Sequence, residues 1–280
     1  MKRLLSIDGG GIRGIIPAYI LSNICNAGKF DLIAGTSTGG ILACALGQGR
    51  PASDLVQMYT KRGPEIFNKA WYRMTAFEPK YTDAGIAKVL WQTLGMTRFS
   101  NSLIKLLVPA FNMVKDSPAH FKSWEDPVDG MDLMYDVARA TSAAPTYFPA
   151  YKGYADGGLF ANNPAMNCYA EARSLWPGEE LEMLSLGTGY KPEHRKYPNY
   201  GGLAEWAKPV IGAIMDSPSH DIDYMMKVCL GDSYTRIQGE LPSNVNPAMD
   251  DASEKNTYNL QVFAQSLVKD NNLALSKWRS

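Results

Sequence analysis

The sequence predicts an α/β protein with a mostly parallel central sheet flanked by helices. Two observations carry this prediction. Up to Leu46, strand-like and helix-like apolar segments alternate, and glycine-rich turns separate them. A strand, helix, strand, helix order implies parallel pairing of the strands. In addition, a chain of 280 residues is long enough to bury about three quarters of its unfolded surface in a large core.

The remaining elements follow from apolar spacing and turn residues. Strands are expected over 2–7, 30–34, 104–113, 119–124 and 181–186, with the third and fourth as an antiparallel pair. Helices are expected over 15–24, 41–46, 52–62, 83–94, 132–140, 164–175 and 258–278. We find no linker, repeat or low-complexity tract. Residues 1–280 are therefore expected to form a single domain, with a motif-bearing core over 4–190 and a mostly helical part over 200–280.

A Gly-x-Ser-x-Gly turn joins the second strand to the second helix. Gly35 and Gly39 bracket Ser37, and the apolar run 30–34 precedes them. Small residues allow strand and helix to pack closely at such a bend, which pushes the serine out of the sheet. The start of the helix also presents free N–H groups to an anion. Ser37 is therefore predicted to be a nucleophile.

A second glycine loop follows the first strand and permits two interpretations. Gly9, Gly11 and Gly14 have the G-x-G-x-x-G spacing of a dinucleotide-binding turn, and Asp31 is an acidic residue near the expected ribose position. An NAD-binding dehydrogenase is thus one alternative. Consecutive glycines can equally aim N–H groups at one point, as an oxyanion hole requires. A neighbouring parallel strand would bring Gly10 and Gly11 beside Ser37, which favours the oxyanion hole.

The serine needs a base, and the chain offers few candidates. The three histidines are His120, His194 and His220. The order Ser37, Asp156, His194 matches a hydrolase triad, although His194 lies in a polar loop. Asp156 is a second candidate, because a short apolar strand leads into it and the glycines at 157 and 158 clear space around it. A buried carboxylate within reach of Ser37 could take its proton directly. The same residues also suit an ordinary tight turn.

Together, these segments resemble the patatin-like phospholipase family. The resemblance covers Asp8–Gly14, Gly35–Gly39, the segment 140–148, the Asp156-Gly157-Gly158 turn and the strand and turn over 184–189. It implies a three-layer fold and hydrolysis of phospholipid acyl esters by a Ser37–Asp156 dyad through an acyl-enzyme. It also implies that the amides of Gly10, Gly11 and Thr38 hold the oxyanion, with Arg13 in support. The family needs no histidine, no metal and no cofactor.

The resemblance also bears on partners. A phospholipid membrane surface would be the substrate, and two segments are candidates for a lid. Residues 64–81 combine aromatic and cationic side chains, which suits a membrane interface or a packed aromatic cluster. Residues 209–226 carry apolar side chains and methionines. Some bacterial relatives are anti-phage effectors switched on by a cyclic nucleotide, so a cyclic-nucleotide activator is a further hypothesis.

The composition argues against several other classes of protein. Lys plus Arg and Asp plus Glu are both 28, and a zero net charge argues against binding a nucleic-acid polymer. The four cysteines (25, 44, 168 and 229) have no zinc or redox spacing. Cys25 and Cys44 lie on apolar helix faces and are expected to be buried thiols. We find no signal peptide and no transmembrane run, so the expected location is cytoplasmic, with peripheral membrane contact during catalysis.

Overall fold

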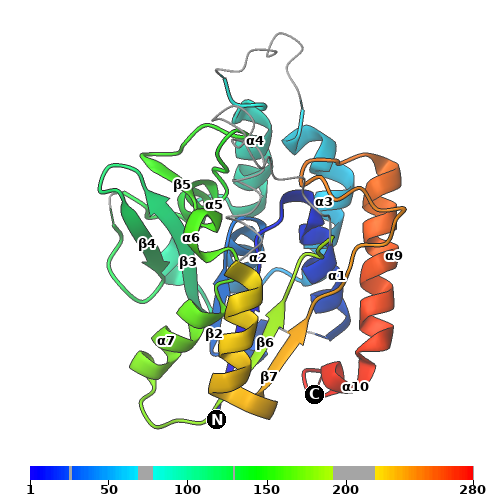
Figure 1. Cartoon of the computed structure of the whole chain (residues 1–280). Coiled ribbons are helices and arrows are strands. Elements are labelled where there is room, and N and C mark those ends of the chain that lie inside the picture. Colours follow the sequence, from blue (N-terminus) through cyan, green and yellow to red (C-terminus); the bar gives the residue numbers. More distant parts are fainter. Residues whose placement is uncertain (25–26, 69–77, 129, 192–217, 280) are drawn as a thin grey trace, which may run out of the picture.

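The computed structural model describes residues 1–24, 27–68, 78–128, 130–191 and 218–279 (Figure 1). Within this part of the chain, seven strands form one sheet in the order β4-β3-β2-β1-β6-β7, and β5 pairs with β3. The strands are β1 Lys2–Ile7, β2 Leu32–Gly35, β3 Lys105–Asn112, β4 Ser117–Lys122, β5 Tyr154–Asp156, β6 Leu181–Leu186 and β7 Tyr234–Ile237. Strands β3, β2, β1, β6 and β7 are parallel, whereas β4 and β5 run antiparallel to β3. The mostly parallel sheet and the antiparallel pair at its edge are as predicted.

Helices cover both faces of this sheet. They are α1 Ile15–Ile24, α2 Thr38–Gly47, α3 Ala52–Ile66, α4 Ala84–Leu94, α5 Met134–Thr141, α6 Gly158–Ala161, α7 Ala165–Leu175, a helix over 218–230, α9 Glu254–Asp270 and α10 Asn272–Ser276. On one face, α7 and the helix over 218–230 (yellow in Figure 1) pack against Leu4, Leu32 and Met183. On the other face, α1, α2, α3, α5 and α9 share a core with Leu5 and Ile33. The architecture has three layers.

The central strands fix where the loops emerge. Strand β1 is flanked by β2 and β6, and its last four residues are buried, which explains its nearly continuous apolar sequence. In register, Ile7 pairs with Gly35 on one side and with Leu186 on the other. The loops that follow β1, β2 and β6 therefore leave the sheet side by side, at its carboxyl edge. Ligand sites of parallel α/β sheets lie at this edge.

Within its described residues, the C-terminal part is less helical than the sequence suggests. The helix over 218–230 and α9 agree with the prediction, but β7 was missed. This strand has only four residues, and Arg236 interrupts its apolar pattern. The helix expected over 258–278 begins earlier, at Glu254, where the Ser253 hydroxyl accepts the Asn256 N–H. It also breaks at Asn271, between α9 and α10.

The expectations for the cysteines and for the two lid candidates concern residues that the structure describes only in part. Cys44 and Cys168 are buried and Cys229 is exposed, while Cys25 lies outside the described residues. Of the first lid candidate, residues 69–77 lie outside, and of the second, 209–217. Their described remainders include Tyr81 and Met226, which are buried in the core. Among the described helices, none combines the length and apolarity needed to cross a bilayer.

Candidate active site

Ser37 occupies a strained bend between β2 and α2. Its backbone has φ 56° and ψ −121°, a conformation that costs a non-glycine residue about 1–3 kcal/mol. The two neighbouring glycines make the bend sterically feasible. A Cβ on Gly39 would lie 2.2 Å from the carbonyl oxygen of Ile7, and a Cβ on Gly35 would lie 2.1 Å from that of Gly39. This local geometry is that of a nucleophile elbow.

The carboxylate of Asp156 contacts the serine hydroxyl directly. Ser37 Oγ donates to Asp156 Oδ2 at 2.6 Å, and the Gly158 N–H donates to Oδ1 at 2.7 Å. Asp156 ends β5, whose antiparallel pairing with β3 sets it opposite Ala110. Its side chain is buried, and burial raises its pKa to about 7, against the opposing effect of the two hydrogen bonds. The contact expected from the sequence is confirmed, and the carboxylate has the basicity that proton transfer near neutral pH requires.

Three backbone amides near Ser37 have no hydrogen-bond partner in the part of the chain that the structure describes. Within the described residues, no hydrogen bond is formed by the N–H groups of Gly10, Gly11 or Thr38. Thr38 is the first residue of α2, and Gly11 lines the same pocket as Ser37. The Gly9 N–H is not available, because it donates to the carbonyl oxygen of Asn162 at 3.0 Å. Free N–H groups at a helix start are suited to stabilising a negative oxygen.

Two arginines hold the glycine loop in place. Arg13 is buried and donates from Nε to the carbonyl oxygen of Gly10 at 3.4 Å and from Nη1 to that of Gly189 at 3.3 Å, which agrees with its predicted supporting position. Arg236 forms a two-point ion pair with Asp8, at 2.9 and 2.6 Å. Burial alone would lower the pKa of Arg236, but the Asp8 carboxylate outweighs it and raises that pKa. This pair was not predicted, because no sequence pattern indicated the strand β7 that carries Arg236.

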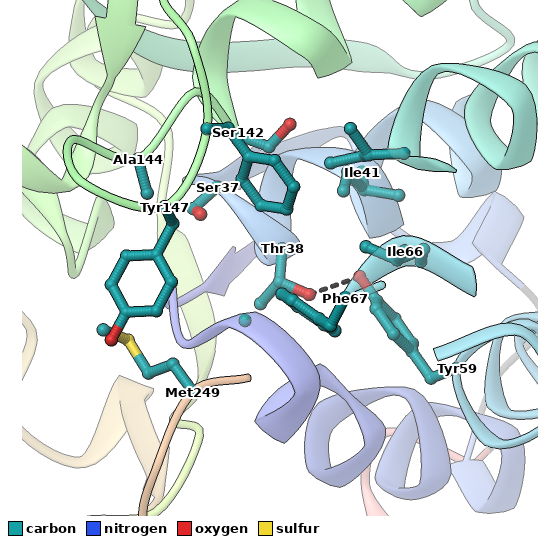
Figure 2. Close-up of a pocket in the computed structure, with 13 residues that line it drawn as sticks. Ser37, Thr38, Ile41, Tyr59, Ile66, Phe67, Ser142, Ala144, Tyr147 and Met249 are labelled. Atoms are coloured by element: carbon teal, nitrogen blue, oxygen red, sulfur yellow. Dashed lines mark hydrogen bonds between the residues drawn. The ribbon is translucent and has the colours of Figure 1, made fainter. Parts of the chain in front are cut away.

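An apolar pocket opens beside Ser37 (Figure 2). Its walls come from the glycine loop, α2, α3, α4, the segment 142–148 and Met249. Phe67 and Phe148 stand in its wall and, with Tyr81, form an aromatic cluster with ring centroids 5.6–5.9 Å apart. For Phe67 and Tyr81, the packed-cluster alternative is therefore correct. In Figure 2 the hydroxyl of Tyr59 meets that of Thr38. A cavity volume of about 40 Å³ leaves room for only a few water molecules.

The histidines do not join this site within the described structure. His120 lies on β4, where its Nε2 is 2.9 Å from the Asn167 side-chain nitrogen. Burial lowers the pKa of His120. His220 is exposed and stacks edge-on with Tyr190. No hydrogen bond links either of them to Ser37 or Asp156 among the described residues, and His194 lies outside those residues.

The position of Asp31 and the contacts of the glycine loop do not favour the dinucleotide interpretation. A Cβ on Gly10 would lie 2.3 Å from Thr188 Oγ1, and one on Gly11 would lie 2.2 Å from the carbonyl oxygen of Met249. Both glycines are thus in tight contact with other chain segments on the side where a Cβ would lie. Asp31 precedes β2, at the opposite edge of the sheet from the loop, and pairs there with Lys2 at 2.9 Å. It cannot reach a ribose bound at the glycine loop.

Comparison with known proteins agrees with this geometry. Residues 5–169 match the patatin-like phospholipase family. Patatin-like protein 2 of Arabidopsis thaliana is 31% identical, over 95% of this chain and 82% of its own length. "Probable inactive patatin-3-Kuras 1" of Solanum tuberosum is 30% identical, over 96% and 87%.

Among solved structures, VipD from Legionella pneumophila is 13% identical, with a TM-score of 0.35 over 95% of this chain and 67% of that chain. The sequence match covers both the glycine loop and the elbow, and it extends past Asp156. The chain belongs to the patatin-like phospholipase family.

Proposed function

We propose that this lipid acyl hydrolase cleaves phospholipid acyl esters with a Ser37–Asp156 dyad. The direct 2.6 Å hydrogen bond between the two side chains is the observation that carries the proposal. One relative bears the name of a probable inactive patatin, so we base the proposed activity on the geometry of the site as well as on family membership. A histidine between serine and carboxylate, as a triad requires, has no room at this distance.

In the proposed first step, Asp156 Oδ2 takes the proton of Ser37 Oγ as that oxygen attacks the ester carbonyl. The negative carbonyl oxygen then rests on the amides of Gly10, Gly11 and Thr38. Collapse of this intermediate breaks the ester bond, and Asp156 returns the proton to the leaving lysolipid. Water then attacks the acyl-enzyme, with Asp156 again as base, and the fatty acid leaves.

The pocket supports an acyl chain as the group bound beside the serine. Its lining is apolar on several sides, with Ile41, Ile66 and Ile86 among the wall residues. With a cavity volume of about 40 Å³, a long chain must either displace the walls or extend out through the open side of the pocket. We also propose that the protein is cytoplasmic and contacts a phospholipid membrane surface peripherally during catalysis.

Covalent labelling tests the proposal directly. With wild-type protein and a fluorophosphonate probe, mapped by peptide mass spectrometry with and without phosphatidylcholine–phosphatidylglycerol vesicles, we expect modification of Ser37. The Ser37→Ala variant is the matched control and should remain unmodified at this peptide. Labelling elsewhere, or no labelling of Ser37 under both conditions, would contradict an activated serine.

The pH dependence distinguishes the dyad from a triad. Since the pKa of Asp156 is about 7, the labelling rate should be low at pH 5, rise through pH 7 and level off above pH 8. His120→Ala, His194→Ala and His220→Ala should each stay within about threefold of the wild-type rate, because none of these residues handles the proton. A strong loss in His194→Ala would support the triad instead.

A cyclic-nucleotide activator remains a hypothesis about regulation. The small volume of the pocket supports a requirement for some signal that widens it. Fatty-acid release from the same vesicles, measured with and without cyclic dinucleotides and trinucleotides, tests it. Release that depends on the membrane alone would argue against a nucleotide signal.

A further inference from the structure

The segment 140–148 runs beside the dyad and makes contacts to both Ser37 and Asp156. We propose that Thr141 is a positioning residue that holds Ser37 in its strained, reactive conformation. This inference rests on the proposed function of Ser37 and Asp156. Thr141 is the last residue of α5 and carries one hydroxyl group.

Thr141 is fully buried, and both branches of its side chain are engaged. Its Oγ1 accepts the backbone N–H of Ser37 at 2.9 Å and donates to the carbonyl oxygen of Pro109 at 2.6 Å. Its methyl group packs against α2, where a Cβ on Gly40 would lie 2.7 Å from Thr141 Cγ2. The hydroxyl thus links the elbow to β3, and the methyl group fills space beside the helix.

The hydrogen bond has a specific consequence for Ser37. Strained backbone persists only where the surroundings hold it. The N–H of Ser37 donates to the hydroxyl of Thr141. This hydrogen bond fixes the orientation of the peptide group before Ser37, which accompanies φ 56° at that residue. Without it, the buried N–H would lack a partner, and the backbone at Ser37 could relax toward an ordinary φ, which would move Oγ away from Asp156.

The same segment also holds the base. Two residues beyond Thr141, the carbonyl oxygen of Ala143 accepts the Asp156 N–H at 3.0 Å. Pro109, which accepts the Thr141 hydroxyl, packs against the Asp156 turn, since a Cβ on Gly157 would lie 2.3 Å from its carbonyl oxygen. The segment 141–143 thus contacts both the nucleophile and the base. Thr141 contacts Ser37, and Ala143 contacts Asp156.

The two branches of Thr141 allow a matched test. Thr141→Val keeps the shape and the methyl contact but removes the hydroxyl, whereas Thr141→Ser keeps the hydroxyl and removes the methyl group. With a water-soluble p-nitrophenyl butyrate substrate, we expect Thr141→Val to lower kcat by about 10- to 100-fold, with KM within about threefold of wild type. We expect Thr141→Ser to retain kcat within about threefold, even if its Tm falls further than that of Thr141→Val.

The outcomes separate the alternatives. A packing role predicts the reverse order, with Thr141→Val close to wild type and Thr141→Ser impaired, and would overturn the proposal. Equal losses of kcat in both variants would also overturn it. If Thr141→Val does not fold, the proposal still requires that Thr141→Ser keeps kcat within about threefold of wild type. A larger loss of kcat in Thr141→Ser would overturn it. An inactive wild type that also resists the fluorophosphonate probe would instead refute the proposed function itself.

Discussion

Replacing Asp156 by Asn should nearly abolish turnover while making the protein more stable at alkaline pH. The amide has the shape of the carboxylate but cannot accept the proton of Ser37. Loss of a general base in this position should lower kcat by about 10³-fold. Fatty-acid release and the fluorophosphonate labelling rate should fall together, because both depend on the activated hydroxyl.

The gain in stability follows from the raised pKa of Asp156, about 7 against an ordinary 3.8. Below pH 3.8 the carboxyl is neutral in the folded and unfolded chain alike. Between pH 3.8 and 7 the folded chain holds a proton that the unfolded chain has lost, so wild-type stability falls as pH rises through this window. Above it, the loss is complete and amounts to about 4 kcal/mol at most.

The Asn variant lacks this titration and should keep its hydrogen bonds. Its oxygen can accept the Gly158 N–H, and its NH₂ can donate to Ser37 Oγ. Urea unfolding of both proteins at pH 4 and pH 8 checks the prediction. We expect similar stability at pH 4 and a more stable variant at pH 8. A variant less stable than wild type at pH 8 would mean that Asp156 is not a strained, buried base.

Gly39→Ala should destabilise the protein strongly, although glycine-to-alanine changes in helices usually stabilise by about 1 kcal/mol. The added Cβ would lie 2.2 Å from the carbonyl oxygen of Ile7, and this atom belongs to the backbone of the central strand. Neither β1 nor α2 can move without disturbing the elbow. We expect a loss of about 3 kcal/mol or more.

Gly178→Ala is the control for this prediction. Gly178 has φ +81° in an exposed turn, and nothing lies within 4 Å of an added Cβ. Only the backbone conformation opposes alanine there, at a cost of about 1 kcal/mol. Thermal unfolding of the two variants beside wild type gives the comparison. Equal melting temperatures would show that the elbow has more space than the contacts around Gly39 indicate.

The features that the sequence predicted are those with local signals. Glycines at 35 and 39 mark the elbow within five residues, and apolar runs mark β1, β2 and β6. The Asp156 turn could be located in the same way, although only the structure brings it to Ser37, which is 119 residues away in sequence.

The features that were missed depend on contacts between distant segments. Arg236 lies 228 residues from Asp8, and nothing in its own short strand indicates a buried ion pair. Thr141 looks like an ordinary residue at a helix end, and Tyr59 and Met249 like ordinary core residues. Their positions around Ser37 arise from the packing of α3, α5 and the C-terminal segment, which no local pattern encodes.

The near-complete burial of Asp156 limits how the proton that it handles can reach the surrounding buffer. A base that is 1% exposed, beside a serine that is 7% exposed, has almost no surface that a buffer molecule can contact, although it still titrates with the pH of the solution. In the proposed mechanism, the hydrogen that leaves the serine is the one that completes the departing alcohol. Acylation would then proceed at the same rate in dilute and concentrated buffer, and the medium would register acid only when the released fatty acid ionises.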